Sequence, residues 1–109
     1  MDEHILARFE ARSQIMKALA HPARLLIVDE LSKNEQCVND LTAMIGADMS
    51  TVSRHLAVLK NAGIIQDRRQ GAQVYYSMSI PCVMDFFVCA EKVLESRLEK
   101  QLSVIKKQL

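Results

Sequence analysis

The sequence predicts a single domain, residues 1–109, that is mainly α-helical and carries one small β-hairpin. Three observations support this fold class. The 109 residues suffice for one compact domain, and half of them are hydrophobic, which is enough for a core. Three glycines and two prolines are too few for the many turns of a β-sandwich or barrel. Apolar residues follow helical spacing along most of the chain and change to strand-like alternation only between residues 64 and 78.

Helical spacing in the first half of the chain predicts helices at residues 3–19, 22–31 and 37–45. Pro22 separates the first two helices, because the residue before a proline avoids the helical region while proline suits the first position of a helix. Gly46 ends the third helix at the position that favours a left-handed residue. We expect this helix to turn Val38, Leu41, Met44 and Ile45 inward.

A fourth helix at residues 49–62 follows a tight link, and Asp48 or Ser50 can cap it. Its expected inward-facing residues are Val52, Leu56, Leu59 and Ala62. A short helix, a turn and a longer helix form a helix-turn-helix pattern. Residues 64–69 and 73–78 then alternate like two strands joined by a turn, which predicts the β-hairpin.

The last predicted helix, residues 81–107, is too long for the domain that precedes it. About 26 residues at 1.5 Å each give a length of roughly 40 Å. Its apolar stripe therefore needs a second molecule to cover it. The stripe consists of Val83, Phe86, Phe87, Ala90, Leu94, Leu98, Leu102 and Ile105.

The net charge of +1 hides a segregation of charge along the chain. Residues 1–49 carry eight acidic and five basic side chains, whereas residues 50–73 carry one acidic and four basic ones. A polyanion would therefore meet the middle of the chain first. The chain has neither an apolar run long enough to span a membrane nor a basic start followed by an apolar stretch, so we expect a cytoplasmic protein without membrane contact.

The polar outer face of the fourth helix predicts contact with the major groove of DNA. Val52, Leu56 and Leu59 must face the core, which leaves the N-terminal half of the helix free to enter the groove. Basic side chains on the hairpin would hold the phosphate backbone. The predicted DNA-binding residues are Ser50, Thr51, Ser53, Arg54, His55, Lys60, Arg68, Arg69 and Gln73.

Three other interpretations of this surface are weaker or remain open. The polar face could be merely solvated, or it could bind another protein. An enzyme is not expected, because the chain has no recognisable catalytic triad and no glycine-rich phosphate loop.

Five segments carry a family resemblance: Ala18–Leu25 (ALAHPARL), Val38–Leu41 (VNDL), Ser50–Leu59 (STVSRHLAVL), Ala62–Ile65 (AGII) and Arg68–Gly71 (RRQG). They occur in order over nearly the whole chain and resemble the ArsR/SmtB family of winged-helix repressors. The resemblance implies a winged helix-turn-helix fold and a homodimer joined by the first and last helices. It also implies a repressor that needs no cofactor to bind double-stranded operator DNA and that leaves the operator when an inducer binds.

Three cysteines, Cys37, Cys82 and Cys89, are the candidate inducer ligands. Their odd number gives no disulfide framework, so we expect free thiols. In arsenic-responsive members of the family a second cysteine stands where this chain has Asn39. The zinc site of other members is also missing, since no histidine follows His55 and two isolated acids on the last helix make a poor transition-metal site.

Three thiolates suit a soft ion, so we predict trivalent arsenic or antimony as the inducer, ahead of cadmium, lead or Cu(I). An undistorted helix would hold Cys82 and Cys89 about 10.5 Å apart along its axis. Two sulfurs on one ion lie at most about 4.6 Å apart. Cys82 must therefore turn inward from the start of the helix, beside Pro81, with Cys37 as the third ligand.

Two alternatives for the cysteines stay open. Cys37 and a last-helix cysteine could form a disulfide or polysulfide and report oxidants or reactive sulfur. The thiols could also be small apolar fillers, which is common for free cysteine. None of the three histidines is a favoured metal ligand, and His21 is expected at the junction of the first two helices.

Overall fold

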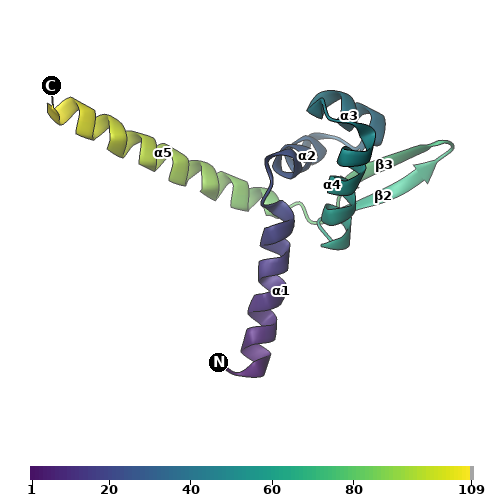
Figure 1. Ribbon diagram of the computed structural model, residues 1–109, viewed down its shortest axis with the longest axis horizontal. Helices are drawn as coiled ribbons and strands as arrows, with labels where there is room; N and C mark the ends of the chain where they lie inside the picture. The colour runs from purple at the N-terminus through teal and green to yellow at the C-terminus, as the bar shows by residue number, and fades with distance from the viewer. Residues whose placement is uncertain (109) are drawn as a thin grey trace.

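The computed structural model describes residues 1–108, which form a winged helix-turn-helix from which two long helices project (Figure 1). All five predicted helices and both strands of the hairpin are present, with ends that differ from the prediction by one or two residues. The helices are α1 (Glu3–Leu19), α2 (Pro22–Lys33), α3 (Val38–Ile45), α4 (Met49–Asn61) and α5 (Val83–Gln108). The strands are β1 (Gln36–Cys37), β2 (Ile65–Gln70) and β3 (Gln73–Met78).

The sheet has three strands in the order β1-β3-β2, and both pairings are antiparallel. The hairpin of β2 and β3, residues 65–78, is called the wing below. Strand β1 is a finding that the sequence did not predict, because two residues are too few to show alternation. It pairs Gln36 with Tyr76 and Cys37 with Tyr75, so the segment before α3 is hydrogen-bonded to the wing. Cys37 precedes α3 as its N-cap residue instead of beginning the helix.

The core lies where α2, α3 and α4 meet the base of the wing. Val52, Leu56 and Leu59 of α4 are fully buried, as their spacing predicted. The prediction for α3 was correct for Leu41 but wrong for Met44, which is 36% exposed because it lies on the solvent side of this short helix. The buried residues of this core cluster are Ala18, Leu19, Ile27, Val28, Leu31, Leu41, Val52, Leu56, Leu59, Ile64 and Ile65.

Side chains and backbone geometry fix the helix ends near the turn between α3 and α4. The Asp48 carboxylate accepts a hydrogen bond of 2.7 Å from the backbone N–H of Thr51 and so caps α4. Gly46 ends α3 with φ of 76°, the left-handed conformation that the sequence predicted. These two ends set the tight connection between the two helices.

Helices α1 and α5 point away from the core in different directions and leave apolar side chains uncovered (Figure 1). The chain measures 62 × 44 × 22 Å along its principal axes. A groove of about 640 Å³ runs between the α1–α2 junction and α5, and its apolar lining includes Met16, Leu25, Leu26, Phe86, Phe87 and Leu94. The exposed stripe of α5 extends beyond the groove through Leu98, Leu102 and Ile105. The chain by itself therefore leaves most of the apolar stripe of its long helix uncovered, as predicted.

Replacing Gly46 by alanine should lower the free energy of unfolding by about 1–2 kcal/mol. Nothing lies within 4 Å of the added Cβ, so the cost comes from the left-handed backbone alone. Urea denaturation at fixed protein concentration measures the change. Gly46→Asn is the matched control, because asparagine tolerates this conformation better, and equal stability of the alanine variant and the parent would contradict the prediction.

Candidate nucleic-acid interface

The N-terminal half of α4 presents a polar face that is fixed at its first turn. Asp48 accepts hydrogen bonds from the Ser50 hydroxyl and from the Thr51 backbone, both at 2.7 Å. These bonds, the Ser50 one first, lower the pKa of Asp48 to about 2, so the carboxylate stays charged. A phosphate at this turn would meet a fixed negative charge. Contact with a polyanion therefore falls to side chains further along the helix, Ser53 and Arg54, both of which are exposed.

The two arginines of the wing lie on opposite faces of the sheet, because neighbouring residues in a strand alternate. Arg69 pairs with Val74 and shares a face with Asp67, which contacts α4 through Lys60. Arg68 pairs with Tyr75 on the other face. Only Arg69 therefore lies on the same side of the sheet as α4.

Ion pairs decide which of the four basic side chains between residues 50 and 73 are available to a ligand. The Lys60 ammonium lies 3.0 Å from the Asp67 carboxylate. Arg68 donates from Nε to Oε2 of Glu35 at 2.9 Å and from Nη2 to Oε1, and this contact lowers the pKa of Glu35. Within residues 1–108, neither Arg54 nor Arg69 is engaged in an ion pair or a side-chain hydrogen bond. These two guanidinium groups carry the free positive charge of the surface.

Arg68, which was predicted to contact phosphate, is engaged at the surface with Glu35, and its contact with DNA stays a prediction. Its guanidinium also lies 4.8 Å from the ring centroid of Tyr75, and its Nη1 donates to the Gln70 amide oxygen at 2.7 Å. The partner Glu35 is 33 residues earlier in the chain, so no local pattern could have revealed the pair.

His55 corrects the prediction of an outward-facing side chain. It was expected on the outer face of α4, but its ring packs against His21 with centroids 4.4 Å apart, and its Nδ1 accepts a 3.2 Å hydrogen bond from Nε of Arg24. Burial, followed by the nearby charges of His21, Arg24 and Arg54, lowers the pKa of His55. His55 therefore belongs to the packing between α2 and α4.

Arg24 and His21 join three helices at this junction. Nη1 of Arg24 donates to the backbone oxygens of Lys17 and Ala18 at the end of α1, at 3.3 and 3.1 Å. His21 lies at the junction of α1 and α2, as expected, and its Nδ1 caps α2 through the Ala23 N–H at 3.0 Å. Helix α4 is thus linked by side chains to the end of α1.

The remaining predicted DNA-binding residues lie on the surface of α4 and the wing. The exposed members of the predicted set are Ser50, Ser53, Arg54, Lys60, Arg68 and Arg69, and the half-buried members are Thr51, His55 and Gln73. Gln73 begins β3 opposite Gln70, at the tip of the wing. Besides Arg68 and His55, Lys60 is paired with Asp67, and Ser50 and Thr51 contact Asp48. The assignment of the whole set to DNA stays a prediction.

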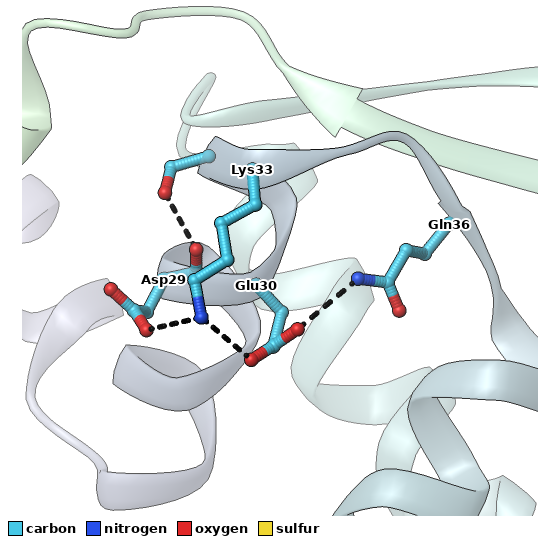
Figure 2. Close-up of polar contacts among 5 residues, drawn as sticks. Asp29, Glu30, Lys33 and Gln36 are labelled. Carbon is cyan, nitrogen blue, oxygen red and sulfur yellow. Dashed lines mark hydrogen bonds and ion pairs between the residues drawn. The ribbon is translucent and has the colours of Figure 1, made fainter.

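Polar contacts fasten the start of β1 to the end of α2 (Figure 2). Gln36 donates from its amide to Oε2 of Glu30 at 3.4 Å. The Lys33 ammonium lies 3.2 Å from Oε1 of Glu30 and 3.6 Å from Oδ2 of Asp29. The segment that leads to Cys37 is therefore held by α2 on one side and by the wing on the other.

The three thiols lie in different surroundings. Cys37 is buried at 8% exposure, whereas Cys82 and Cys89 are exposed. Cys82 directly precedes α5, and Cys89 lies on α5 beside Phe86 and Val93. Among residues 1–108, no three His, Cys, Asp or Glu side chains are grouped so that they could hold a metal ion. One protomer in this conformation does not bring the three thiols together, and the three-sulfur site stays a prediction.

The helices of the described chain include none that is both long and apolar enough to cross a membrane.

Comparison with known proteins gives a consistent result for the whole domain. The model of the bacterial regulatory protein family arsR matches residues 21–67. An uncharacterised HTH-type transcriptional regulator of Mycobacterium tuberculosis is 32% identical over 98 residues, which cover 89% of this chain and 86% of that protein.

Two solved structures extend the likeness to three dimensions. The homodimeric winged helix-turn-helix DNA-binding domain of Mycobacterium bovis Mb0332 has a TM-score of 0.78 at 29% identity, covering 92% of this chain and 93% of that one. The transcriptional repressor BigR of Xylella fastidiosa has a TM-score of 0.71 at 29% identity, covering 85% and 96%.

The low pKa of His55 predicts a loss of stability as the pH falls from 7.5 to 5.5. The folded state favours the neutral imidazole of His55. The free energy of unfolding that His55 contributes is therefore complete above the ordinary pKa of about 6.5 and declines as the pH falls below it. Melting temperatures at fixed protein concentration should fall over this range in the parent. They should fall less in His55→Asn, whose amide oxygen can still accept from Arg24.

His4→Asn on the exposed start of α1 is the matched control and should keep the pH dependence of the parent. An equal decline in the parent and in His55→Asn would contradict the role given to His55.

Proposed function

The chain belongs to the arsR family of bacterial regulatory proteins, and from this membership we propose that it is a cytoplasmic, homodimeric transcriptional repressor that binds double-stranded operator DNA. The observation that carries the proposal is the position of the two free guanidinium groups. Arg54 lies on the open face of α4, and Arg69 lies on the face of the wing that turns toward α4. A helix in the major groove and a basic hairpin on the adjacent backbone would use both groups.

The dimer is supported by the apolar surface that one chain leaves exposed. Phe9 on α1 and Phe86, Leu94 and Leu98 on α5 are each about half exposed, and the 640 Å³ groove lies between these helices. Burial of such side chains against a second copy provides the main driving force for association. A two-fold dimer could then place its two α4 helices about 34 Å apart, one turn of DNA. The M. bovis relative is itself described as a homodimeric DNA-binding domain.

We propose that the inducer acts on thiols, with trivalent arsenic or antimony as the first candidate ligand. Each metalloid, as its trihydroxide, would exchange three hydroxyl groups for the sulfurs of Cys37, Cys82 and Cys89, and the hydroxyl groups would leave with the thiol protons as three waters. Cys82 lies just before α5, so its movement disturbs only the first turn of the long helix, where its carbonyl accepts from the Asp85 N–H at 3.1 Å. Binding would have to draw the three residues together, within one chain or between two, and this movement would change how α4 is presented to DNA.

A second candidate needs only two sulfurs, and the lack of any three grouped His, Cys, Asp or Glu side chains among residues 1–108 favours it on that ground. Cys37 and Cys89 could form a disulfide when a peroxide takes up the two electrons and the two thiol protons and leaves as water and an alcohol. A polysulfide could take up the same two electrons and two protons, its S–S bond breaking to give sulfide and a shorter polysulfide. Either reaction requires one contact between β1 and α5 instead of a three-way cluster.

Arg54→Ala should weaken binding to the promoter of the chain's own gene by about 1–3 kcal/mol and reduce the salt dependence if Arg54 contacts phosphate. Fluorescence anisotropy with labelled duplex at several salt concentrations measures both quantities. Lys92→Ala on α5 removes the same charge away from α4 and serves as the control. If neither the parent nor any variant binds duplex at low salt, the proposed function is wrong.

Cys37→Ser should keep the operator affinity of the parent but lose its release by inducer. In the parent, arsenite should lower the affinity by about 5–150-fold, the usual range of allosteric coupling. The measurement is the same anisotropy titration with arsenite in the presence of reductant, repeated with a tetrasulfide after the reductant is removed. Cys89→Ser should behave like Cys37→Ser.

Counting the protected thiols separates the two candidates. Three protected thiols per chain with arsenite support the metalloid site, whereas two with tetrasulfide alone support the disulfide. A Cys37→Ser protein that still leaves DNA under both treatments would contradict any role of this thiol.

A further inference from the structure

We propose that Glu35 is a positioning residue for the wing and that its pair with Arg68 couples the wing to the segment that contains Cys37. This inference rests on the proposed function, because the wing matters only if the domain binds DNA. It assigns Arg68 an internal task in place of the phosphate contact that its position in the sequence suggests.

The first step of the argument is that Arg68 is already occupied. Its Nε and Nη2 donate to the two carboxylate oxygens of Glu35, and its Nη1 donates to Gln70. Its guanidinium stacks over Tyr75. Two parallel hydrogen bonds to one carboxylate, together with stacking on an aromatic ring, hold a guanidinium in a specific orientation. A phosphate would have to displace the Glu35 carboxylate to bind Arg68.

The second step is that Glu35 is fastened to the rest of the domain by the residues that follow it. Gln36 is hydrogen-bonded to Glu30 of α2, as Figure 2 shows. Gln36 and Cys37 also form β1, which pairs with β3 at Tyr76 and Tyr75. Glu35 can therefore hold the outer part of β2 in place relative to α2 and α3.

The third step concerns Cys37, which lies two residues after Glu35 and is paired with Tyr75, the residue that supports the Arg68 guanidinium. Cys37 is buried, so a reaction at its thiol requires β1 to move. Movement of β1 disturbs the Cys37–Tyr75 pairing and carries Glu35 away from Arg68. A change at Cys37 would thus reach the wing directly, without passing through α5.

The affinity of Glu35→Gln for the operator distinguishes the two possible roles of Arg68, because it should fall for one role and rise for the other. If Glu35 positions the wing, Glu35→Gln and Arg68→Gln should each weaken operator binding about fivefold. The salt slope, which is the dependence of the binding constant on salt concentration, should not change. The double variant should bind no more weakly than either single variant. If Arg68 binds phosphate and Glu35 competes for it, Glu35→Gln should strengthen binding, and Arg68→Gln should reduce the salt slope by about one.

Two further proteins control for charge. Glu99→Gln removes the same charge from the far part of α5 and should leave the affinity unchanged. The exchange of both residues, Glu35→Arg with Arg68→Glu, keeps the net charge and should recover most of the lost affinity. Failure of this exchange combined with a reduced salt slope in Arg68→Gln would overturn the proposal.

The coupling to Cys37 is tested without DNA. In a full-length Cys82→Ser, Cys89→Ser background, Cys37 is the only thiol, and its rate of reaction with iodoacetamide reports how often β1 opens. Adding Glu35→Gln should raise this rate about fivefold, whereas adding Glu99→Gln should not change it. Equal rates in all three proteins would overturn the coupling. Because this measurement needs no operator, it still tests the coupling if the parent protein binds no duplex and the proposed function fails.

Discussion

The rotation of α4 about its own axis is the constraint on which the rest of the site depends. Three side chains on one face of this helix, Val52, Leu56 and Leu59, have no exposed surface. Full burial of each stabilises the fold by about 1.5–3 kcal/mol, so turning the helix by even a third of a turn would expose more apolar surface than the domain can tolerate. The outward direction of Ser53 and Arg54 follows from this burial, without any interaction of their own.

Tertiary ion pairs then determine how the basic surface can be used. The sequence between residues 50 and 73 is rich in positive charge, but Asp67 neutralises Lys60, and Glu35 neutralises Arg68. What remains free is one guanidinium on α4 and one on the wing. A count of charges along the chain therefore overstates the number of groups that can contact a phosphate, although it locates the surface correctly.

The elements that the sequence predicted are those whose signal is local. Helices α1 to α5 and the hairpin repeat an apolar pattern over several turns or alternations, and Gly46 marks the end of α3 by its own backbone preference. Strand β1 was missed because a two-residue strand has no period. Its existence depends on the presence of β3 about 40 residues later, which no local pattern records.

The contacts of His55 and Arg68 were missed for the same physical reason. His55 lies at the edge of the buried face of α4, where helical spacing alone does not decide between solvent and a neighbouring helix; His21 and Arg24 decide it. The direction of Arg68 was likewise set by Glu35, which is distant in sequence. Charged and polar side chains take their orientation from specific partners, whereas apolar ones are oriented by burial in general, and so the core was predicted better than the polar site.

The segment from Glu35 to Cys37 connects a thiol directly to the wing within one chain. This connection is shorter than one that passes through α5 and the dimer interface. A signal that acts through α5 must change the separation of two recognition helices, and α5 leaves most of its apolar stripe without support from its own chain. A signal that moves β1 must break its two-residue pairing with β3 and a few side-chain polar contacts, each of these of small energy because the side chains are partly exposed. A small coupling suffices, since 1–3 kcal/mol changes affinity by about 5–150-fold. The weak contacts around β1 thus make this segment easier to move than the buried core beside it.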